Sequence, residues 1–264
     1  MTVDAAIEKL LRRDRLIVLG GLAVIVVIAW LYLIALVGQM SEMRMQPAMS
    51  DMMSMAQPRS WTAIDALLML VMWATMMTAM MVPSATPVIL LYARLSRGRK
   101  SQRQPFAPTA AFLAGYLTVW IIFSATLTAL QWGLEHMALL SPLMVSASPT
   151  FGGMVLIAAG LYQWSPIKNA CLGHCRAPVQ FLSTRWRPGV GGVFRMGVEH
   201  GLYCLGCCWA LMLLLFVGGV MNLLWAAALA VFVLIEKVAP FGRRAGQAGA
   251  LLLIVSGVFI LLSA

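Results

Sequence analysis

Residues 69–81 read MLVMWATMMTAMM, and the interpretation of the whole chain starts from this stretch. Six of its residues are methionine, and no charged residue interrupts it. A run this apolar predicts a helix that crosses a membrane. The thioether sulfur of methionine is a soft, neutral ligand suited to Cu(I), so a methionine run at bilayer depth indicates a copper-handling protein.

The methionines of this helix fall mainly on one face. At about 100° per residue, four of them lie within a sector of roughly 80°: Met69, Met72, Met76 and Met80. Asp65 shares that sector, and Met77 and Met81 widen the stripe on one side. Methionine also packs well in ordinary helix interfaces, which is the alternative for any single residue. The whole stripe favours a functional face, because it includes an acidic residue that lipid should exclude.

Composition predicts an integral membrane protein, since hydrophobic residues make up 61% of the 264 residues and charged residues only 11%. The expected fold is all-α, a transmembrane helix bundle that forms one domain over residues 1–264. We expect about seven spans, with six as the alternative. They cover roughly residues 16–38, 62–83, 109–131, 150–167, 196–217, 219–236 and 246–263. The first run lacks a small-residue cleavage site, so we expect it to be retained.

The net charge of +10 is distributed in a way that favours membrane orientation over nucleic-acid binding. Seventeen of the nineteen lysines and arginines precede the first span or lie around the connections that follow spans two, four and six. Only Arg44 and Arg59 lie on the other connections. Because basic residues concentrate on the cytoplasmic side, we expect a cytoplasmic amino terminus and, after seven spans, an external carboxyl terminus.

The first external connection, residues 39–60, reads QMSEMRMQPAMSDMMSMAQPRS and contains seven methionines. It has two prolines and no hydrophobic periodicity, which is typical of a connection without regular structure. Exposed thioethers do not serve core packing, so we expect this loop to collect Cu(I) on the external side. A low-complexity loop without a ligand is the alternative.

The cytoplasmic connection, residues 168–195, carries the motif NACLGHC at residues 169–175. Its two thiols and one imidazole, from Cys171, Cys175 and His174, could bind one soft metal ion if the backbone turns at Gly173. Cytoplasmic thiols stay reduced, which argues against a structural disulfide. Two incidental loop cysteines are the alternative.

The fifth span contains MGVEHGLYCLGCC at residues 196–208. Four of its side chains fall within a sector of roughly 80°: Met196, His200, Cys204 and Cys207. Cys208 lies just beside them, and Glu199 lies on the neighbouring face. Ionisable residues inside a span indicate function, so this segment predicts a metal or redox site. Gly201 and Gly206 would let another helix approach closely.

A shielded ion needs ligands from more than one helix, so we expect the second and fifth spans to pack against each other. The Met76–Met80 face would then lie opposite His200, Cys204 and Cys207. In this arrangement Asp65 and Glu199 share one interior seam, where water or a counter-charge lowers the free-energy cost of placing their charges inside the membrane.

The ends of two spans carry further signals. Pro83 and Pro87 predict that the second span ends or kinks near residue 83. Glu236 and Lys237 end the sixth span, and we interpret them as an anchor in the membrane interface, where a long side chain keeps its charge in water.

Three blocks of sequence carry a resemblance to a known family: WATMMTAMMVPSATP from residue 73, YQWSPIKNACLGHCRAP from residue 162 and GVEHGLYCLGCCWALMLLLFVGGVMNLLWAAALAVFVLIEK from residue 197. Over residues 63–237 the chain resembles a bacterial family of predicted metal-binding integral membrane proteins, the domain of unknown function 2182. The resemblance adds no reaction. It points to Met76, Met77, Met80, Met81, Pro83, Cys171, Cys175, Cys204, Cys207, Cys208, Glu236 and Lys237.

These observations predict a multi-pass protein of the bacterial inner membrane that binds Cu(I), or another soft metal ion. It would move the ion across the membrane or deliver it to a metalloenzyme. Expected partners are membrane lipid and a periplasmic copper donor or a metalloenzyme, without nucleic acid. No catalytic residue is assigned, and no ATPase motif is found in the sequence. The predicted metal ligands are Met72, Met76, Met77, Met80, Met81, Cys171, His174, Cys175, His200, Cys204, Cys207 and Cys208.

Two other classes of protein fit the same residues. A membrane thiol–disulfide oxidoreductase would use Cys171 with Cys175 and Cys204 with Cys207 as exchanging pairs. A structural assembly factor without bound metal would use methionine and cysteine for packing alone. Metal analysis of the purified protein distinguishes the structural assembly factor from the other two classes.

Overall fold

The computed structural model describes residues 3–44, 61–97, 106–140, 144, 146 and 148–263. Within these ranges the regular structure is helical apart from one isolated bridge between Leu140 and Ser146, so the all-α prediction is confirmed. Residues 45–60 of the methionine-rich connection lie outside the described residues. The helices are α1 (Val3–Arg44), α3 (Ala63–Arg97), α4 (Phe106–His136), α5 (Pro149–Gln163), α6 (Pro166–Arg176), α7 (Pro178–Arg185), α8 (Gly189–Leu213), α9 (Leu215–Gly218), α10 (Leu223–Val238) and α11 (Gly242–Ser263).

Five helical segments in the described part of the chain are long and apolar enough to cross a membrane: Arg15–Met40, Ala63–Ser96, Pro108–His136, Gly189–Gly218 and Gly242–Ser263. Each overlaps one predicted span. The other two predicted spans correspond to α5 and α10, which have 15 and 16 residues. At about 1.5 Å per residue these helices are roughly 23 Å long, shorter than a hydrocarbon core of about 30 Å. The seven-span count and the orientation therefore stay predictions.

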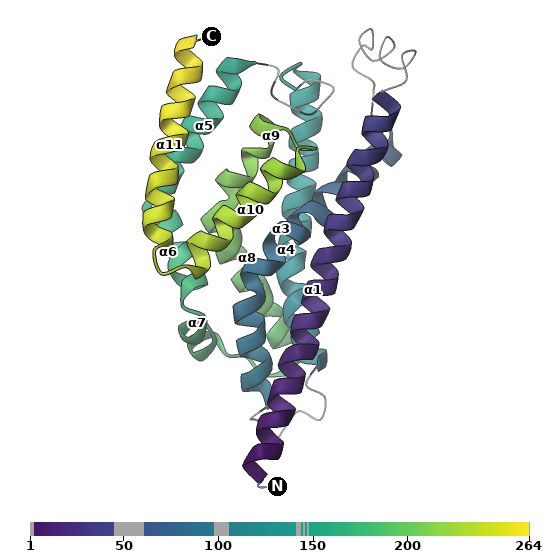
Figure 1. Ribbon diagram of the computed structural model, residues 1–264, viewed down its shortest axis with the longest axis vertical. Helices are drawn as coiled ribbons and strands as arrows, with labels where there is room; N and C mark the ends of the chain where they lie inside the picture. Colours follow the sequence, from purple (N-terminus) through teal and green to yellow (C-terminus); the bar gives the residue numbers. More distant parts are fainter. Residues whose placement is uncertain are drawn as a thin grey trace.

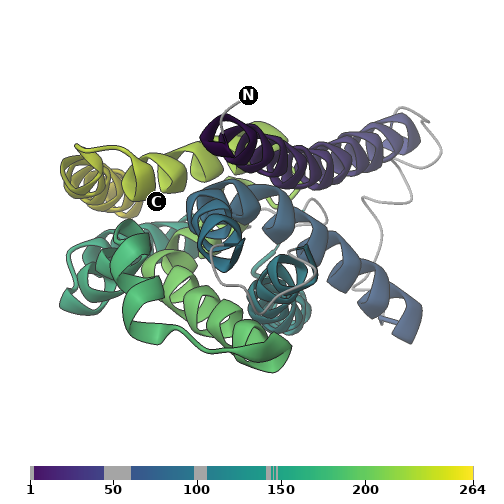
Figure 2. The ribbon, with the colours of Figure 1, turned by 90° about the horizontal axis from the view of Figure 1, so that it is seen from below.

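The chain begins and ends at opposite ends of the bundle (Figure 1). We call these the amino-terminal end, where α1 starts, and the carboxyl-terminal end, where α11 finishes. The core between them is formed mainly by α3, α4 and α8. Helices α3 and α4 contribute most of the largest fully buried side chains, and α8 contributes its buried cysteines and methionines. Helix α1 lies along α3 on the outside of the bundle (Figure 2).

Helix α3 does not end at Pro83. It continues through Pro83 and Pro87 to Arg97, so the predicted end of the second span near residue 83 is wrong. A proline removes one backbone donor but does not end a membrane helix whose neighbouring groups compensate. Ser84, which follows the first proline, donates from Oγ to the Met81 carbonyl at 2.9 Å.

Glycines bring α8 close to α4. A Cβ atom at Gly197 would overlap the carbonyl oxygen of Phe112, and one at Gly115 would overlap the carbonyl oxygen of Phe194. The two helices therefore touch backbone against backbone, which is the usual role of small residues between membrane helices. This contact fixes the position of the α8 thiols relative to α4.

The predicted close approaches at Gly201 and Gly206 are confirmed. A Cβ atom at Gly201 would lie 2.9 Å from a methyl group of Val119 on α4. One at Gly206 would lie 2.7 Å from Sγ of Cys171 on α6. Helix α8 is thus held between α4 on one side and α6 on the other.

Candidate metal centre

All five methionines of α3 that are predicted as ligands are buried. Met72 is 2% exposed, and the others are 0–1% exposed: Met76, Met77, Met80 and Met81. The outward face of α3 instead carries Leu67, Leu68 and Val71, which are 59%, 56% and 43% exposed. The methionine stripe therefore faces the protein interior.

Three thiols on α8 lie in the same core cluster as this stripe. Cys204, Cys207 and Cys208 are each 1% exposed. The Sγ atoms of Cys207 and Cys208 each donate to the carbonyl oxygen of Cys204, at 3.0 Å in both cases. Residues three and four positions apart are neighbours on a helix, so the three thiols share one side of α8.

The stripe and the thiols meet at Met81, whose Sδ lies 3.9 Å from Sγ of Cys208. Tyr116 on α4 joins the same place, because its hydroxyl donates to the Met81 carbonyl and lies 3.0 Å from Sγ of Cys204. Helices α3 and α8 each pack on α4 and reach each other through these side chains, not along their backbones. The structure thus brings sulfurs of the two helices together at Met81, just beyond the predicted Met76–Met80 face.

Lys237 reaches into this sulfur cluster. Its Nζ lies 2.9 Å from Sγ of Cys204 and 3.2 Å from Oγ of Ser84, and the residue is only 6% exposed. The interpretation of Glu236 and Lys237 as an interfacial anchor is therefore wrong. Helix α10 packs on α3, α6 and α11, and Glu236 and Lys237 are buried, at 2% and 6% exposure, so neither keeps its charge in water.

Glu236 is paired separately. Both of its carboxylate oxygens lie 2.8 Å from Nζ of Lys168, and Gln163 Nε2 donates to one of them at 3.2 Å. Lys168 also donates to the Gln163 side-chain oxygen. Gly246 leaves room for this carboxylate, since a Cβ atom there would overlap it. The charge of Glu236 is thus balanced by Lys168, which leaves the thiol cluster as the close neighbour of the Lys237 ammonium.

The two cysteines of α6 face α8. Cys171 lies against Gly206, and Cys175 is a neighbour of Cys207. Burial raises the pKa of the Cys171 thiol. Interaction with Cys207, followed by burial, raises the pKa of the Cys175 thiol well above its usual value. Both groups are therefore protonated at neutral pH in the absence of a metal.

His174 lies on the same side of α6 as the two cysteines, because the helix continues through Gly173 and residues three and four positions apart are neighbours on a helix. Its ring is engaged by other groups in the structure. Its ring stacks on Tyr203 with centroids 4.1 Å apart, and its Nδ1 lies 2.9 Å from the Ala170 carbonyl oxygen.

His200 is buried one turn before Cys204, with 3% of the residue exposed. Aromatic rings of Phe112, Tyr116 and Phe181 surround it at centroid distances of 6.1, 5.9 and 5.2 Å. Within the described residues its Nδ1 has no hydrogen-bond partner. A buried, unpaired imidazole nitrogen is costly and suits a ligand.

The prediction that Asp65 and Glu199 share one interior seam is wrong. Glu199 pairs with arginines, at 3.1 Å from Arg187 and 3.5 Å from Arg195. Asp65 lies in the first turn of α3 and accepts hydrogen bonds from Thr62. Each acid has closer partners on its own side of the bundle, so neither is available to line the sulfur cluster.

Among the residues that the structure describes, no three His, Cys, Asp or Glu side chains are arranged to hold one metal ion. Thioethers fall outside that set. With metal–sulfur bonds of about 2.3 Å and trigonal angles, two sulfur ligands stand about 4 Å apart. The 3.9 Å between Met81 and Cys208 therefore fits a soft metal, although other ligands would have to turn toward this pair to close the site.

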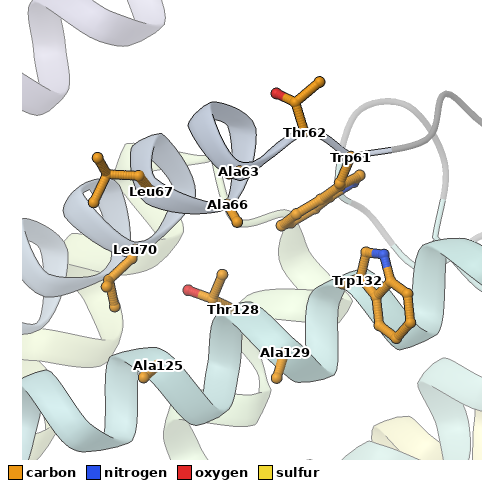
Figure 3. Close-up of a pocket in the computed structure, with 10 residues that line it drawn as sticks. All are labelled: Trp61, Thr62, Ala63, Ala66, Leu67, Leu70, Ala125, Thr128, Ala129 and Trp132. Atoms are coloured by element: carbon orange, nitrogen blue, oxygen red, sulfur yellow. The ribbon is translucent and has the colours of Figure 1, made fainter.

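A larger cavity lies elsewhere among the described residues. It measures about 630 Å³ and opens between the first half of α3 and the last half of α4 (Figure 3). Trp61 and Trp132 lie at one end, and alanine and leucine side chains line most of it. None of the described residues around it is Met, Cys, His or acidic, so it offers no ligand for a soft metal.

Comparison with protein families assigns the chain to one of them. The family described as PpoB2, copper chaperone, matches residues 70–260. The chain belongs to the PpoB2 copper chaperone family. No curated protein and no solved structure matched.

In this PpoB2 family member, the matched region contains the buried part of the methionine stripe, both cysteines of α6, the α8 thiols and Lys237. The prediction of a copper-related membrane protein is supported at this level. The name domain of unknown function 2182 stays a prediction.

The family resemblance pointed to Lys237, but reasoning from the residues assigned it to the membrane interface, and Tyr116 was not included among the site residues. Lys237 had a usable signal, since a lysine ends an apolar segment too short to span a membrane. Tyr116 had none, because a tyrosine in an apolar helix is common, and only the packing of α4 shows that its hydroxyl lies between two sulfur-bearing helices.

Proposed function

We propose that this chain binds Cu(I) inside the bacterial inner membrane and carries it from the methionines of α3 to the thiols of α8, for transport or for delivery to a metalloenzyme. The observation that carries the proposal is the 3.9 Å contact between Met81 and Cys208. It joins a buried row of thioethers to a buried group of thiols. Membership of a copper chaperone family supports copper as the metal, with another soft ion as the alternative.

The chemistry of the ligands sets a direction. Thioethers are neutral and thiolates are anionic, so Cu(I) is held more tightly as it moves from methionine to cysteine. Met72, Met76 and Met80 follow one another at steps of four residues, which makes them neighbours on the helix surface. The ion can therefore pass between adjacent sulfurs while the protein shields it from lipid.

Two further side chains suit this role. His200 offers an unpaired ring nitrogen on the helix that carries the thiols. Lys237 places a cationic group 2.9 Å from Cys204, which compensates negative charge on that sulfur while no ion is bound. A copper ion that binds Cys204 would take over this compensation.

The test is the copper content and Cu(I) affinity of the purified protein in detergent under reducing conditions. Cys204→Ser combined with Cys207→Ser should abolish stoichiometric copper, and Met81→Leu should weaken binding while the protein stays folded. Ser124→Ala is a matched control, because Ser124 is fully buried on α4 and bonds only to the carbonyl of its own helix at Trp120. Unchanged copper in the cysteine variant would refute the proposed site.

The cysteines of α6, which face the thiols of α8, favour one rival function. Neighbouring thiols on the two helices, such as Cys175 and Cys207, would exchange with a disulfide in a membrane oxidoreductase. All five cysteines are free in the structure. Mild oxidation followed by peptide mass analysis decides between the two. A rapid and reversible Cys175–Cys207 disulfide, together with absence of copper, would favour the redox function.

A further inference from the structure

A second group of metal ligands lies at the other end of the methionine stripe. There a cavity of about 200 Å³ opens near the carboxyl-terminal end of the bundle, and five residues line it: Trp61, Asp65, Met69, Glu135 and Met144. Met69 is the first methionine of the α3 stripe. It precedes Met81 by twelve residues, which is about 18 Å along the helix. This cavity is therefore distinct from the thiol cluster.

Glu135 is held in place at the cavity wall. Trp61 Nε1 donates to one carboxylate oxygen at 2.8 Å, and Gln131 Nε2 donates to the other at 2.9 Å. Gln131 is fully buried, and its own side-chain oxygen accepts a hydrogen bond from Trp73 at 2.8 Å. A carboxylate oriented by a second layer of donors is the usual support for a binding site.

Two methionines from different parts of the chain line the same cavity as Glu135. Met69 Sδ lies 3.7 Å from Gln131 Nε2, so it sits beside the group that orients Glu135. Met144 comes from the connection after α4 and is 9% exposed. Its φ of 55° is in the left-handed region, and its carbonyl accepts a hydrogen bond from the Val220 amide at 3.2 Å. The fold thus keeps Met144 at the cavity although its backbone conformation is unfavourable for methionine.

We infer that this cavity is a capture site for a soft monovalent cation, Cu(I) above all. The thioethers of Met69 and Met144 bind the ion, the carboxylates of Asp65 and Glu135 attract it, and the Trp61 ring covers it. Thioether sulfur selects soft metals, while carboxylates raise the local concentration of cations. An aromatic face adds a favourable cation–π contact.

The cavity leads into the stripe. Behind Met69 the next sulfurs on the same face belong to Met72, Met76 and Met80, all of which are 1–2% exposed. No cysteine is among the described residues that line the cavity, so the site holds an ion less tightly than the thiols do and can pass it on. The inference rests on the proposed function, since it supplies the first binding position for the same ion.

The experiment is a Cu(I) titration of the full-length protein in detergent, under reducing conditions and against a chromophoric competitor. Two classes of bound Cu(I) are expected, a tighter class at the thiols and a weaker, lower-affinity class at the cavity. Met69→Leu combined with Met144→Leu should lower the affinity of the weaker class at least about tenfold, because both thioethers are lost while the apolar volume is kept. The tighter class should be unchanged. Met137→Leu is the control, since Met137 is 70% exposed and does not line the cavity.

A second variant, Glu135→Gln, removes charge without removing a thioether and should also weaken the weaker class. If the double methionine variant elutes as an aggregate in gel filtration, Met69→Leu alone is measured in its place. Binding equal to that of Met137→Leu would overturn the inference. Equally effective competition by millimolar Mg²⁺ or Ca²⁺ would overturn it too, because it would show an acidic site for hard cations.

The thiol site and the capture site can be refuted separately. Cys204→Ser with Cys207→Ser should remove only the tighter class of ions. Loss of the weaker class in the methionine variant with full copper in the cysteine variant would refute the thiol site and support the capture site. The reverse result would refute the capture site and support the thiol site.

Discussion

The buried ion pair between Lys168 and Glu236 predicts a large and specific effect on stability. Lys168 Nζ lies 2.8 Å from both carboxylate oxygens, and the two side chains are only 2% and 3% exposed. Lys168→Met removes the ammonium and leaves the carboxylate inside the protein. Its remaining side-chain partner is then the amide of Gln163, which donates at 3.2 Å.

The expected loss can be worked out from these contacts. Removing one member of a buried ion pair costs about 3–5 kcal/mol, because the other charge is left uncompensated. The hydrogen bond from Gln163 is already present in the parent protein, so it does not offset this loss. We therefore expect Lys168→Met to lower the free energy of unfolding by about 3–5 kcal/mol. Adding Glu236→Met removes the second charge and should bring stability back to within about 1 kcal/mol of the parent protein.

The assay is unfolding by SDS titration in mixed micelles, followed by helical circular dichroism. Arg185→Met is the control, since Arg185 is 47% exposed and lies 4.0 Å from Glu199, a geometry worth less than about 1 kcal/mol. A Lys168→Met effect no larger than that of the control would refute the reasoning. So would a double variant whose loss equals the sum of the two single losses.

Three other predictions follow from the same structure. Gly197→Ala should destabilise the protein by about 1–3 kcal/mol because its Cβ overlaps the Phe112 carbonyl, whereas Gly191→Ala, with open space around it, should be neutral or stabilising in the same SDS titration. Tyr116→Phe should cost about 1 kcal/mol through its lost hydrogen bond, and an unchanged midpoint would show that the hydroxyl contributes nothing. Reporter fusions after residues 50 and 100 should lie on opposite sides of the membrane, with residue 100 cytoplasmic, and the reverse result would exchange the capture and thiol sides.

Some features of the site could be predicted because they depend on one segment alone. The buried face of α3 follows from the helical spacing of its methionines, and the close approaches at Gly201 and Gly206 follow from the lack of a side chain. Other features were mispredicted for the same reason. Glu236 and Lys237 were interpreted as an interfacial anchor because they end an apolar segment, and the sequence does not show that the packed fold buries both side chains.

The sequence by itself determined that this is a helical, copper-related membrane protein, because hydrophobicity, charge and ligand type are properties of residues and their spacing. Only the tertiary structure decided which residues meet. Lys237 reaches Cys204, Met81 reaches Cys208, and Met144 reaches the cavity at Met69 across 33, 127 and 75 positions of sequence. Such contacts depend on how helices pack around α4, and that packing is set by many weak interactions between segments that no local pattern records.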